Sequence, residues 1–583
     1  MTTDQRLPDS DSTDYGVSGN GATGEDSTCD RTLNNGHNDA MENGSAVHGI
    51  TENHSMVKEK EANVTTVNSF SCKVLLDGDV PHSQKISDGA TKYRYKSNFK
   101  STLSQLLATL VESLLVVVMG TQCVMPTIVL GALRNNPDEE LSLNDYDAAW
   151  LGSILFLCQP VGSIVSGFLC ERFGRRGSMA LINIPFIVGW ILLHYAASVT
   201  GLFAAALAMG MGIGFCEAPI AAYLGEIGEP HLRGSLLSIM ISATSFGYLS
   251  TYFLGSIMPW RTFALVNLIY PVTTMILFTQ IPESPVWLIH KGRLKEAQKA
   301  LGWLRGFLQP NQVQEEFDRM VKHIESSKSA SPTEKKLNDF GEVTSSERSG
   351  IIGKLLLLRD PMLFQPVRLI FLTFVFTQCM CLQAFKPYLV GILKTFQFPV
   401  NPKWVLIIIG LMSFVGSTMP LFIFRFTGKR NLILYNQFIC CVTVFGLGIY
   451  CSIFNDTLSS DSPWRWLPIV FFAIVFFSSS MGIMNVPWML MGEVFPIRWR
   501  SFATGICGAW AYCVTFVTAR LYLPMESVLS LSGMFYLYGA IGILGFFYFY
   551  FFLPETEGKT LETIESYFTP YHDKKEKFSR PKR

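Results

Sequence analysis

The stretch from Met484 to Arg500, MNVPWMLMGEVFPIRWR, leads a long apolar run into a charged corner. Its Glu493 precedes Arg500 by seven residues, and Glu226 precedes Arg233 by the same distance much earlier in the chain. The repeated spacing indicates that two parts of the chain correspond to each other.

Two more pairs of motifs recur in the same order. Pro282-Glu283-Ser284 ends one hydrophobic block, and Pro554-Glu555-Thr556 ends the other. The segment from Glu171 to Arg176 corresponds in the same way to the segment from Arg425 to Arg430. The three pairs of motifs lie 267, 272 and 254 residues apart. A single Gly-Glu pair would recur by chance, but an ordered set at nearly one offset indicates that a whole membrane half is duplicated.

The composition is that of a membrane protein. Of 583 residues, 49% are hydrophobic and only 16% are charged, and the apolar residues fall in long blocks. The net charge of +1 is spread over short loops and tails, so we expect no nucleic-acid partner. Most of the 13 cysteines lie in apolar runs, which indicates neither a disulfide framework nor a zinc site. The sequence has no Gly-rich phosphate loop and no metal-ligand cluster, so we predict no enzyme activity, no cofactor and no metal.

Apolar runs of about 20 residues predict roughly twelve transmembrane helices. The predicted fold is therefore an all-α membrane protein with twelve transmembrane helices in two six-helix halves. The centres of the predicted spans lie near Val116, Leu157, Pro185, Leu207, Phe246, Val266, Phe376, Met412, Val444, Ile474, Thr515 and Leu544.

Basic residues indicate which side of the membrane is cytoplasmic. Lys92 to Lys96 precede the first predicted span, and Lys574 to Arg583 end the sequence. The loops that connect even-numbered to odd-numbered spans hold Arg172 to Arg176, Arg233 and Lys429-Arg430. Because basic residues favour the cytoplasmic side, we expect a multi-pass protein of the plasma membrane with both termini in the cytoplasm.

The segment between the halves is rich in charge. We interpret it as a linker, because it offers too few apolar residues for a core of its own; the alternative is a regulatory domain. The predicted boundaries are 1–95 for a disordered cytoplasmic tail, 103–281 for the N-terminal half, 282–364 for a cytoplasmic linker with short helices, 365–553 for the C-terminal half and 554–583 for a basic cytoplasmic tail.

One glycosylation site is predicted. The loop after the ninth span carries the sequon Asn-Asp-Thr at Asn455, on the expected extracellular side. Three further sequons lie in the polar N-terminal tail, which we expect to be cytoplasmic and out of reach of the glycosylation enzymes.

Six motifs follow one another along the chain. They are Glu171 to Arg176, Tyr223 to Glu226 with Arg233-Gly234, Pro282 to Pro285 with Trp287, Gly428 to Arg430, Pro487-Trp488 with Glu493 and Arg500, and Pro554 to Thr556 with Gly558 and Thr560 to Glu562. In this order they resemble the sugar porter family of the major facilitator superfamily, which includes facilitative glucose transporters and insect trehalose transporters. The resemblance runs from about Gln105 to Phe568 and implies the major facilitator fold and transport by alternating access.

The charged residues at the ends of the predicted helices could form a cytoplasmic latch. Carboxylates and cations there can pair with neighbouring loops, and such pairs break at modest cost at the aqueous edge of a membrane. Pairs that close in one state and open in the other would bias the rocking of the halves by about 1–3 kcal/mol in total. The alternative is that the charges only set the topology. The residues assigned to the latch are Arg172, Arg175, Glu226, Arg233, Glu283, Lys429, Glu493, Arg500 and Glu555.

The tenth span carries the clearest sign of a solute site. Gly482, Pro487 and Gly492 interrupt it, and a discontinuous helix that lines a cavity can expose backbone groups to a polar solute. Trp488 offers an aromatic face to a sugar ring, and the alternative is a tryptophan that faces lipid. With the positions that the resemblance implies, the candidate solute-binding residues are Thr377, Gln378, Gln383, Ser480, Asn485, Trp488 and Trp510.

The sequence departs from the family at this site. Ile241 and Ala509 stand where sugar porters carry amides, and Thr377 replaces one glutamine of the seventh span. Each missing amide removes one or two hydrogen bonds to a solute hydroxyl, at roughly 1 kcal/mol apiece. Glucose-like recognition is therefore expected to be weaker than in the family.

Three polar residues inside the spans bear on coupling. Glu112 in the first span needs a polar environment, as a proton site or in a hydrogen bond between helices. Lys386 is expected at the outer mouth, facing the solute or snorkelling to the interface. Gln122 stands where proton-coupled relatives carry an aspartate, which favours passive transport.

These observations predict a uniporter, expected to be monomeric, that carries a small polar solute, a hexose or a trehalose-like disaccharide. A non-transporting sugar sensor is a second hypothesis, supported by the long polar N-terminal tail and the reduced set of amides. Transport of a polyol or an organic anion is a third, with Lys386 as a counter-charge to an anion.

Overall fold

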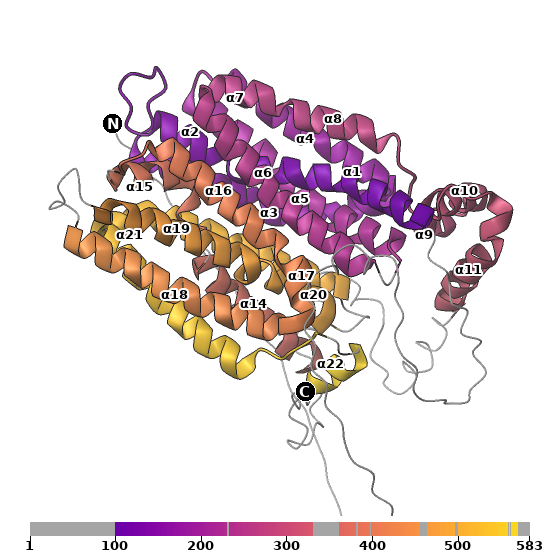
Figure 1. The fold of residues 1–583 in the computed structure, drawn as a ribbon. Coiled ribbons are helices and arrows are strands. Elements are labelled where there is room, and N and C mark those ends of the chain that lie inside the picture. The colour runs from indigo at the N-terminus through magenta and orange to yellow at the C-terminus, as the bar shows by residue number, and fades with distance from the viewer. Residues whose placement is uncertain are drawn as a thin grey trace, which may run out of the picture. The chain divides into compact units, whose positions relative to one another are not determined.

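The computed structural model describes residues 99–229, 232–329, 361–380, 383–396, 398–454, 463–495, 500–557, 559 and 561–568. All of them belong to the second of two compact units, Tyr93–Arg583. Almost all regular structure in these ranges is helical. The long helices of this unit run roughly alongside one another (Figure 1).

The helices before the linker form the N-terminal half. They are α1 (Phe99–Cys123), α2 (Met125–Leu133), α3 (Asp145–Phe173), α4 (Arg175–His194), α5 (Val199–Ile227), α6 (Arg233–Ile257), α7 (Trp260–Asn267) and α8 (Ile269–Phe278).

The described linker consists of short helices, and the C-terminal half follows. The linker helices are α9 (Pro285–His290), α10 (Leu294–Leu304), the 3₁₀ turn η1 (Pro310–Val313) and α11 (Gln314–Ser329). The C-terminal half contains α14 (Pro361–Met380), η3 (Lys386–Tyr388), α15 (Leu389–Thr395), α16 (Pro402–Thr418), α17 (Pro420–Thr427), α18 (Lys429–Phe454), η4 (Pro463–Trp466), α19 (Leu467–Ser478), the π-helical turn η5 (Ser479–Ile483), α20 (Val486–Val494) and α21 (Arg500–Phe552), with α22 (Leu561–Phe568) after it.

The prediction of twelve spans is confirmed within the described residues. Ten helical stretches are long and apolar enough to cross a membrane, and Phe364–Met380 is a shorter apolar helix that supplies the seventh span. The last of the ten stretches contains the non-helical residue Ser530 (φ 61°, ψ 168°), which divides α21 into the eleventh and twelfth spans.

Prolines and polar caps explain several helix boundaries. Pro126, Pro402 and Pro487 each lie at the first or second position of a helix, where the missing N–H costs no hydrogen bond. Asn144 caps α3 by accepting a hydrogen bond from the Asp147 amide at 2.8 Å.

Glycines allow close packing inside the N-terminal half. A Cβ atom on Gly214 of α5 would meet the carbonyl oxygen of Gln159 on α3 at 2.4 Å. A Cβ on Gly247 of α6 would meet the carbonyl oxygen of Val117 on α1 at 2.5 Å. Such small-residue contacts are a common way to pack helices in a membrane. Between the halves, α3 packs along α21 and α6 packs along α16.

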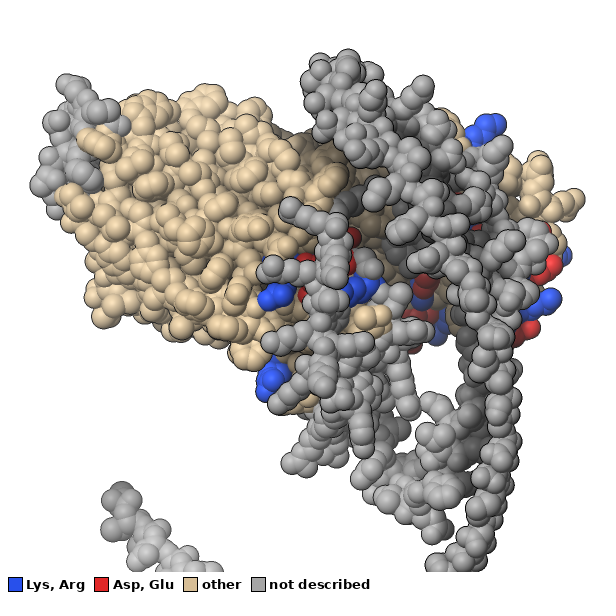
Figure 2. Space-filling view, turned by 60° about the horizontal axis from the view of Figure 1, so that its bottom comes forward, with Lys and Arg blue, Asp and Glu red and all other residues tan. Residues whose placement is uncertain are grey.

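The flank of the bundle exposes apolar side chains. Ile164 is 75% exposed and Phe551 is 68% exposed, as expected for residues that face lipid. Figure 2 shows a broad flank without lysine, arginine, aspartate or glutamate. The charged residues visible in this view gather toward one end of the helix bundle.

The expectation that the linker lacks a core was wrong for residues 285–329. Trp287 of α9, Leu301 of α10 and Phe317 of α11 belong to one cluster of buried apolar residues. The sequence has enough apolar residues at helical spacing to bury one face of each short helix, although its average composition is charge-rich. The rest of the predicted linker, 330–360, and both predicted tails, except for 554–557, 559 and 561–568, lie outside the described residues.

Candidate solute pathway and its charged ends

The first charged corner consists of Arg175, Glu226 and Glu283, at the end of the bundle where α9 begins. The Arg175 guanidinium binds the Glu226 carboxylate, with Nη2 to Oε1 at 2.7 Å. Glu283 accepts hydrogen bonds from the backbone amides of Arg175 and Arg176 at 2.9 and 3.1 Å. Its negative charge therefore lies at the N-terminus of α4, where the helix dipole favours an anion.

The second charged corner, Lys429, Glu493 and Glu555, repeats this arrangement in the C-terminal half. Lys429 forms an ion pair with Glu493 and a second one with Glu557 at 3.0 Å. Glu555 accepts hydrogen bonds from the backbone amides of Lys429 and Arg430, each at 3.1 Å, at the N-terminus of α18. The duplicated sequence motifs thus make equivalent contacts.

In the described structure, each charged corner joins helices of a single half. Arg172, also assigned to the latch, lies exposed at the C-terminal end of α3. The side chains of Arg233 and Arg500 lie outside the described part of the chain, as does Asn455. The contacts that these two arginines make therefore stay a prediction.

At the opposite end of the bundle the two halves touch. The Thr127 hydroxyl of α2 donates to the Lys386 carbonyl at 2.7 Å. The Lys394 ammonium reaches the Gly131 carbonyl at 3.4 Å, and the Arg134 guanidinium lies 5.9 Å from the Tyr388 ring centroid. Figure 1 shows α2 and α15 close together at this end. These contacts join the two halves at this end.

The prediction of a discontinuous tenth span is confirmed. The α-helix α19 passes into the π-helical turn η5, and α20 begins only at Val486. The Asn485 amide donates to the Ser480 carbonyl at 2.6 Å, so these two candidate residues lie together at the break. π-Helical turns often occur at functional sites, since they shift the register of the side chains.

Trp488 packs within a group of aromatic rings. Its ring centroid lies 5.1 Å from that of Phe374 and 5.8 Å from that of Tyr512. The Trp488 residue is half-buried, so part of its surface remains accessible.

The remaining candidates fall into two groups. The amide side chains of Gln378, near the end of α14, and of Gln383, shortly before η3, are both buried. The Gln383 amide contacts the Met484 sulfur at 3.3 Å. Thr377 donates to the Thr373 carbonyl of its own helix at 2.9 Å. The ring of Trp510 stacks on that of Phe371 with their centroids 5.0 Å apart, and the Trp510 indole N–H donates to the Phe371 carbonyl. Both the ring and the N–H of Trp510 are therefore already in contact with Phe371.

Of the two alternatives for Lys386, facing the solute or snorkelling to the interface, the snorkelling alternative was wrong. Lys386 begins η3 and is 8% exposed, and its ammonium lies 4.7 Å from the ring centroid of Tyr248 on α6. The buried ammonium is stabilised by a cation–π interaction with the Tyr248 ring. A snorkelling lysine would instead extend its ammonium into the water at the interface.

Buried polar groups of the N-terminal half also bear on the pathway. Both carboxylate oxygens of Glu112 and both amide atoms of Gln122 and Gln159 are buried without a hydrogen-bond partner in the described structure. Gln159 was missed in the sequence, as was Glu217 of α5, whose carboxylate accepts a hydrogen bond from Tyr512. The signal was available for Glu217, because an acidic residue inside an apolar span is rare.

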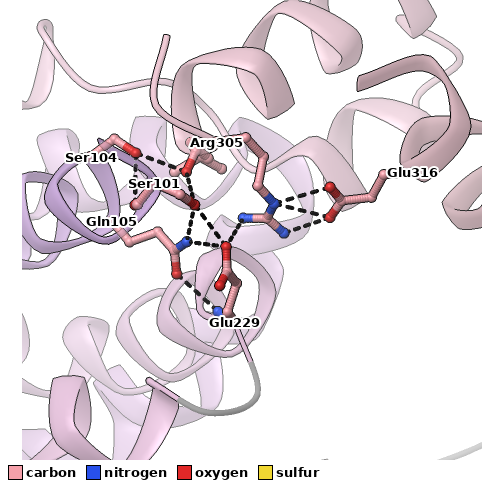
Figure 3. A network of polar contacts seen from close by, with 7 residues as sticks. Ser101, Ser104, Gln105, Glu229, Arg305 and Glu316 are labelled. Carbon is pink, nitrogen blue, oxygen red and sulfur yellow. Dashed lines mark hydrogen bonds and ion pairs between the residues drawn. The ribbon is translucent and has the colours of Figure 1, made fainter. Parts of the chain in front are cut away.

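A polar joint connects the linker helices to the N-terminal half. It consists of Ser101, Gln105, Glu229, Arg305 and Glu316 (Figure 3). Glu229 accepts hydrogen bonds from Ser101 and Gln105 of α1 at 2.7 and 2.8 Å. Arg305, which follows α10, reaches Glu229 at 3.6 Å and Glu316 of α11 at 2.6 Å. The joint therefore holds α1, the end of α5 and two linker helices together.

The comparisons with known proteins agree with this arrangement. The facilitated trehalose transporter Tret1 of Apis mellifera ligustica is 28% identical over 505 residues, which is 86% of this chain and 94% of that protein. Tret1 of Polypedilum vanderplanki is 28% identical over 491 residues, which is 83% of this chain and 93% of that protein.

Solved structures share the fold. The proton:xylose symporter XylE bound to 6-bromo-6-deoxy-D-glucose has a TM-score of 0.59 at 19% identity, with 80% of this chain and 100% of that chain covered. The inward open conformation of XylE from E. coli has a TM-score of 0.61 at 17% identity, with the same coverage.

A family model described as "Sugar (and other) transporter" matches residues 91–568, which is most of the sequence. The chain thus belongs to the sugar (and other) transporter family.

Proposed function

We propose that this membrane protein is a facilitative transporter of a sugar, a hexose or a trehalose-like disaccharide, and that it works by alternating access. The observation that carries the proposal is the pair of equivalent charged corners, one in each half, at the end of the bundle opposite to the contacts between α2, η3 and α15. Two halves that meet at one end and are braced separately at the other have the geometry of a rocking mechanism.

The orientation follows from the basic loops. We assign the end with the charged corners and the linker helices to the cytoplasm, together with both termini, and the end with α2 and α15 to the outside of the plasma membrane. The described state is then closed to the outside. In the opposite state, the contacts of Thr127 and Lys394 with the other half break and the cytoplasmic ends of the halves approach.

The latch acts in this second state. With the cytoplasmic ends together, cations of one half can pair with carboxylates of the other, and Arg233 and Arg500 supply cations beyond those of the two charged corners. Glu283 and Glu555 hold the N-termini of α4 and α18 in both states, since their partners are backbone amides of the same half. In this proposal the ion pairs between the halves form and break during the cycle, while the contacts of Glu283 and Glu555 within each half stay formed.

The solute site lies where the broken tenth span faces the N-terminal half. Trp488 offers a ring face, and Gln378, Gln383 and Asn485 offer amides to hydroxyl groups. Thr377 and Trp510 are weaker candidates, because each already satisfies its donor with a backbone carbonyl. Curated relatives named trehalose transporters support a disaccharide, and glucose and trehalose are the first solutes to test. We expect a monomer without enzyme activity and without a nucleic-acid partner.

The test is uptake of labelled sugars into vesicles that contain only the purified protein. Saturable uptake of glucose or trehalose that stops at equal concentration on both sides is the expected result. Binding without uptake would instead support the sensor, and uptake restricted to polyols or small organic anions would support the third hypothesis. Protein-free vesicles and vesicles with an unrelated membrane protein serve as controls.

A further inference from the structure

Glu217 and Tyr512 join the two halves in the middle of the bundle. Glu217 lies on α5 and Tyr512 on α21, and the Tyr512 hydroxyl donates a hydrogen bond to the Glu217 carboxylate. Ten residues separate Glu217 from Ile227 at the end of α5, about 15 Å along the helix, and twelve separate Tyr512 from Arg500, about 18 Å. Since the hydrocarbon core is about 30 Å thick, the contact lies near its centre.

Glu217 has room for more hydrogen-bond donors than Tyr512 supplies. A carboxylate offers about four acceptor sites, and leaving them unsatisfied inside a membrane is costly. Among the ion pairs in the described ranges, none includes Glu217. Glu217 and Tyr512 are both only half-buried. Acceptor sites therefore remain for a small polar molecule that enters between the halves.

The neighbouring groups complement this acceptor. The ring centroid of Trp488 lies 5.8 Å from that of Tyr512 and 5.1 Å from that of Phe374. A sugar ring carries hydroxyl donors on its edge and C–H groups on its faces, so an acceptor on α5 and an aromatic face on α20 can bind the two kinds of surface at once.

We propose that Glu217 is the main hydrogen-bond acceptor for the solute on the N-terminal half, and that solute hydroxyls replace the Tyr512 hydroxyl on its carboxylate. In the described state, Tyr512 occupies the place of a solute hydroxyl and holds the halves together. Entry of the solute breaks this bond and replaces it with bonds to the solute. The site is then built on α5 and α21 as well as on the broken tenth span.

The inference rests on the proposed function and specifies the solute. It is a neutral molecule with neighbouring hydroxyl groups, a class that includes sugars and polyols. Organic anions are disfavoured, because a second negative charge beside the carboxylate is repelled. The third hypothesis from the sequence is thereby narrowed to polyols.

The first experiment measures equilibrium binding of glucose and trehalose to the purified full-length protein. Glu217→Ala is expected to weaken binding by about 10- to 100-fold, the range for a hydrogen bond to a charged group. Glu217→Gln keeps the shape and one carbonyl acceptor, so its loss is smaller. Fluorine in place of one sugar hydroxyl removes a donor and keeps the size. The parent is expected to discriminate against at least one such fluoro-sugar, and Glu217→Gln is expected to lose most of that discrimination.

The second experiment tests the displacement of Tyr512. Tyr512→Phe is expected to tighten binding several-fold, since the solute no longer has a hydrogen bond to break. The matched control is Tyr522→Phe, ten residues along the same helix, because the Tyr522 hydroxyl donates to Glu526 of its own helix at 3.1 Å. The control is expected to leave binding unchanged.

The outcomes separate this inference from the proposed function. A parent that binds and carries a sugar, with unchanged affinity in both Glu217 variants, overturns the inference alone. Weaker binding in Tyr512→Phe overturns the displacement step. A parent that neither binds nor carries any sugar or polyol refutes the proposed function itself. Gel filtration confirms that Glu217→Gln and Tyr512→Phe keep the size of the parent.

Discussion

Gly174 and Gly428 are the residues at which the two charged corners depend most directly on local backbone geometry. Their φ angles are 87° and 76°, a region that residues with a Cβ rarely adopt. A Cβ on Gly174 would also meet Oε2 of Glu283 at 2.4 Å, and a Cβ on Gly428 would meet Oε2 of Glu555 at 2.5 Å. The absence of a side chain therefore lets each carboxylate reach the helix N-terminus behind the turn.

Gly174→Ala is expected to destabilise the protein in two ways. Gly174 has φ 87° and ψ 175°, a region almost restricted to glycine, so a Cβ there costs about 1–3 kcal/mol. The displaced Glu283 also loses its bonds to the α4 amides. The control is Gly292→Ala, which has a φ of 76° but no atom within 4 Å of the added Cβ. Thermal unfolding in detergent measures both. An equal fall in Tm for the two variants would show that only the backbone strain matters.

Asn455 carries a prediction that only the sequence supports. Asn455→Gln is expected to remove a glycan and to increase gel mobility, with little effect on transport. The measurement is a blot of the parent with and without enzymatic deglycosylation, next to the variant. A parent whose band does not move after deglycosylation carries no glycan there.

At the residue scale, sequence patterns located the charged corners better than the solute site. Spacing relates Glu226 to Glu493 and Glu283 to Glu555, and these residues make equivalent contacts because a duplicated loop folds in the same way twice. The bond between Glu217 and Tyr512 could not be predicted. The two residues are 295 positions apart and lie on different halves, so nothing local in the sequence relates them.

At the scale of elements, periodicity and proline predicted the spans and the break in the tenth one. The succession of η3 and α15 after the seventh span was not predicted, although Pro387 in η3 is a signal that a helix cannot continue unchanged there. The small core of the linker helices was also missed, since three short amphipathic helices bury little apolar area each and are stable only together. The polar joint then fastens this group to α1.

Arg305→Ala tests whether the polar joint carries that attachment. Arg305 is 11% exposed and its partner Glu229 is 7% exposed, so its loss leaves a buried carboxylate with fewer donors, at about 3 kcal/mol. The variant is expected to show a lower Tm and faster proteolysis of the linker helices. Arg293→Ala removes an exposed pair with Glu296 on the same helices and is expected to change neither. Equal proteolysis in the two variants would contradict the role of the joint.

At the scale of the whole molecule, the latch decides how the states are balanced. Arg500→Ala removes one of its cations and is expected to favour the state open to the cytoplasm by part of the total of about 1–3 kcal/mol, up to several-fold in the ratio of states. Labelling of cysteines introduced at the cytoplasmic face measures this ratio. Lys295→Ala, an exposed change on α10, is the control. Unchanged labelling in Arg500→Ala would assign the arginine to topology alone.

Coupling to protons is the last property that belongs to the whole molecule. Net flux through a passive carrier stops at equal concentrations, since nothing but the solute gradient drives the cycle. Gln122 cannot titrate, which favours this outcome. Glu112 is the residue that could change it, because its buried carboxylate has no hydrogen-bond partner in the described structure and would bind a proton if the cycle brought it into contact with water.

The deciding measurement is solute accumulation in vesicles under an imposed pH gradient, for the parent and for Glu112→Gln. We expect the parent to reach equal concentrations and no more, with or without the gradient, and Glu112→Gln to reach the same end point. Accumulation above equality in the parent that the variant abolishes would identify Glu112 as a proton site and the protein as a symporter. Accumulation that survives in Glu112→Gln would still refute the passive cycle. The next candidate for the proton-binding residue would then be Glu217, which lies near the centre of the bundle and joins the two halves.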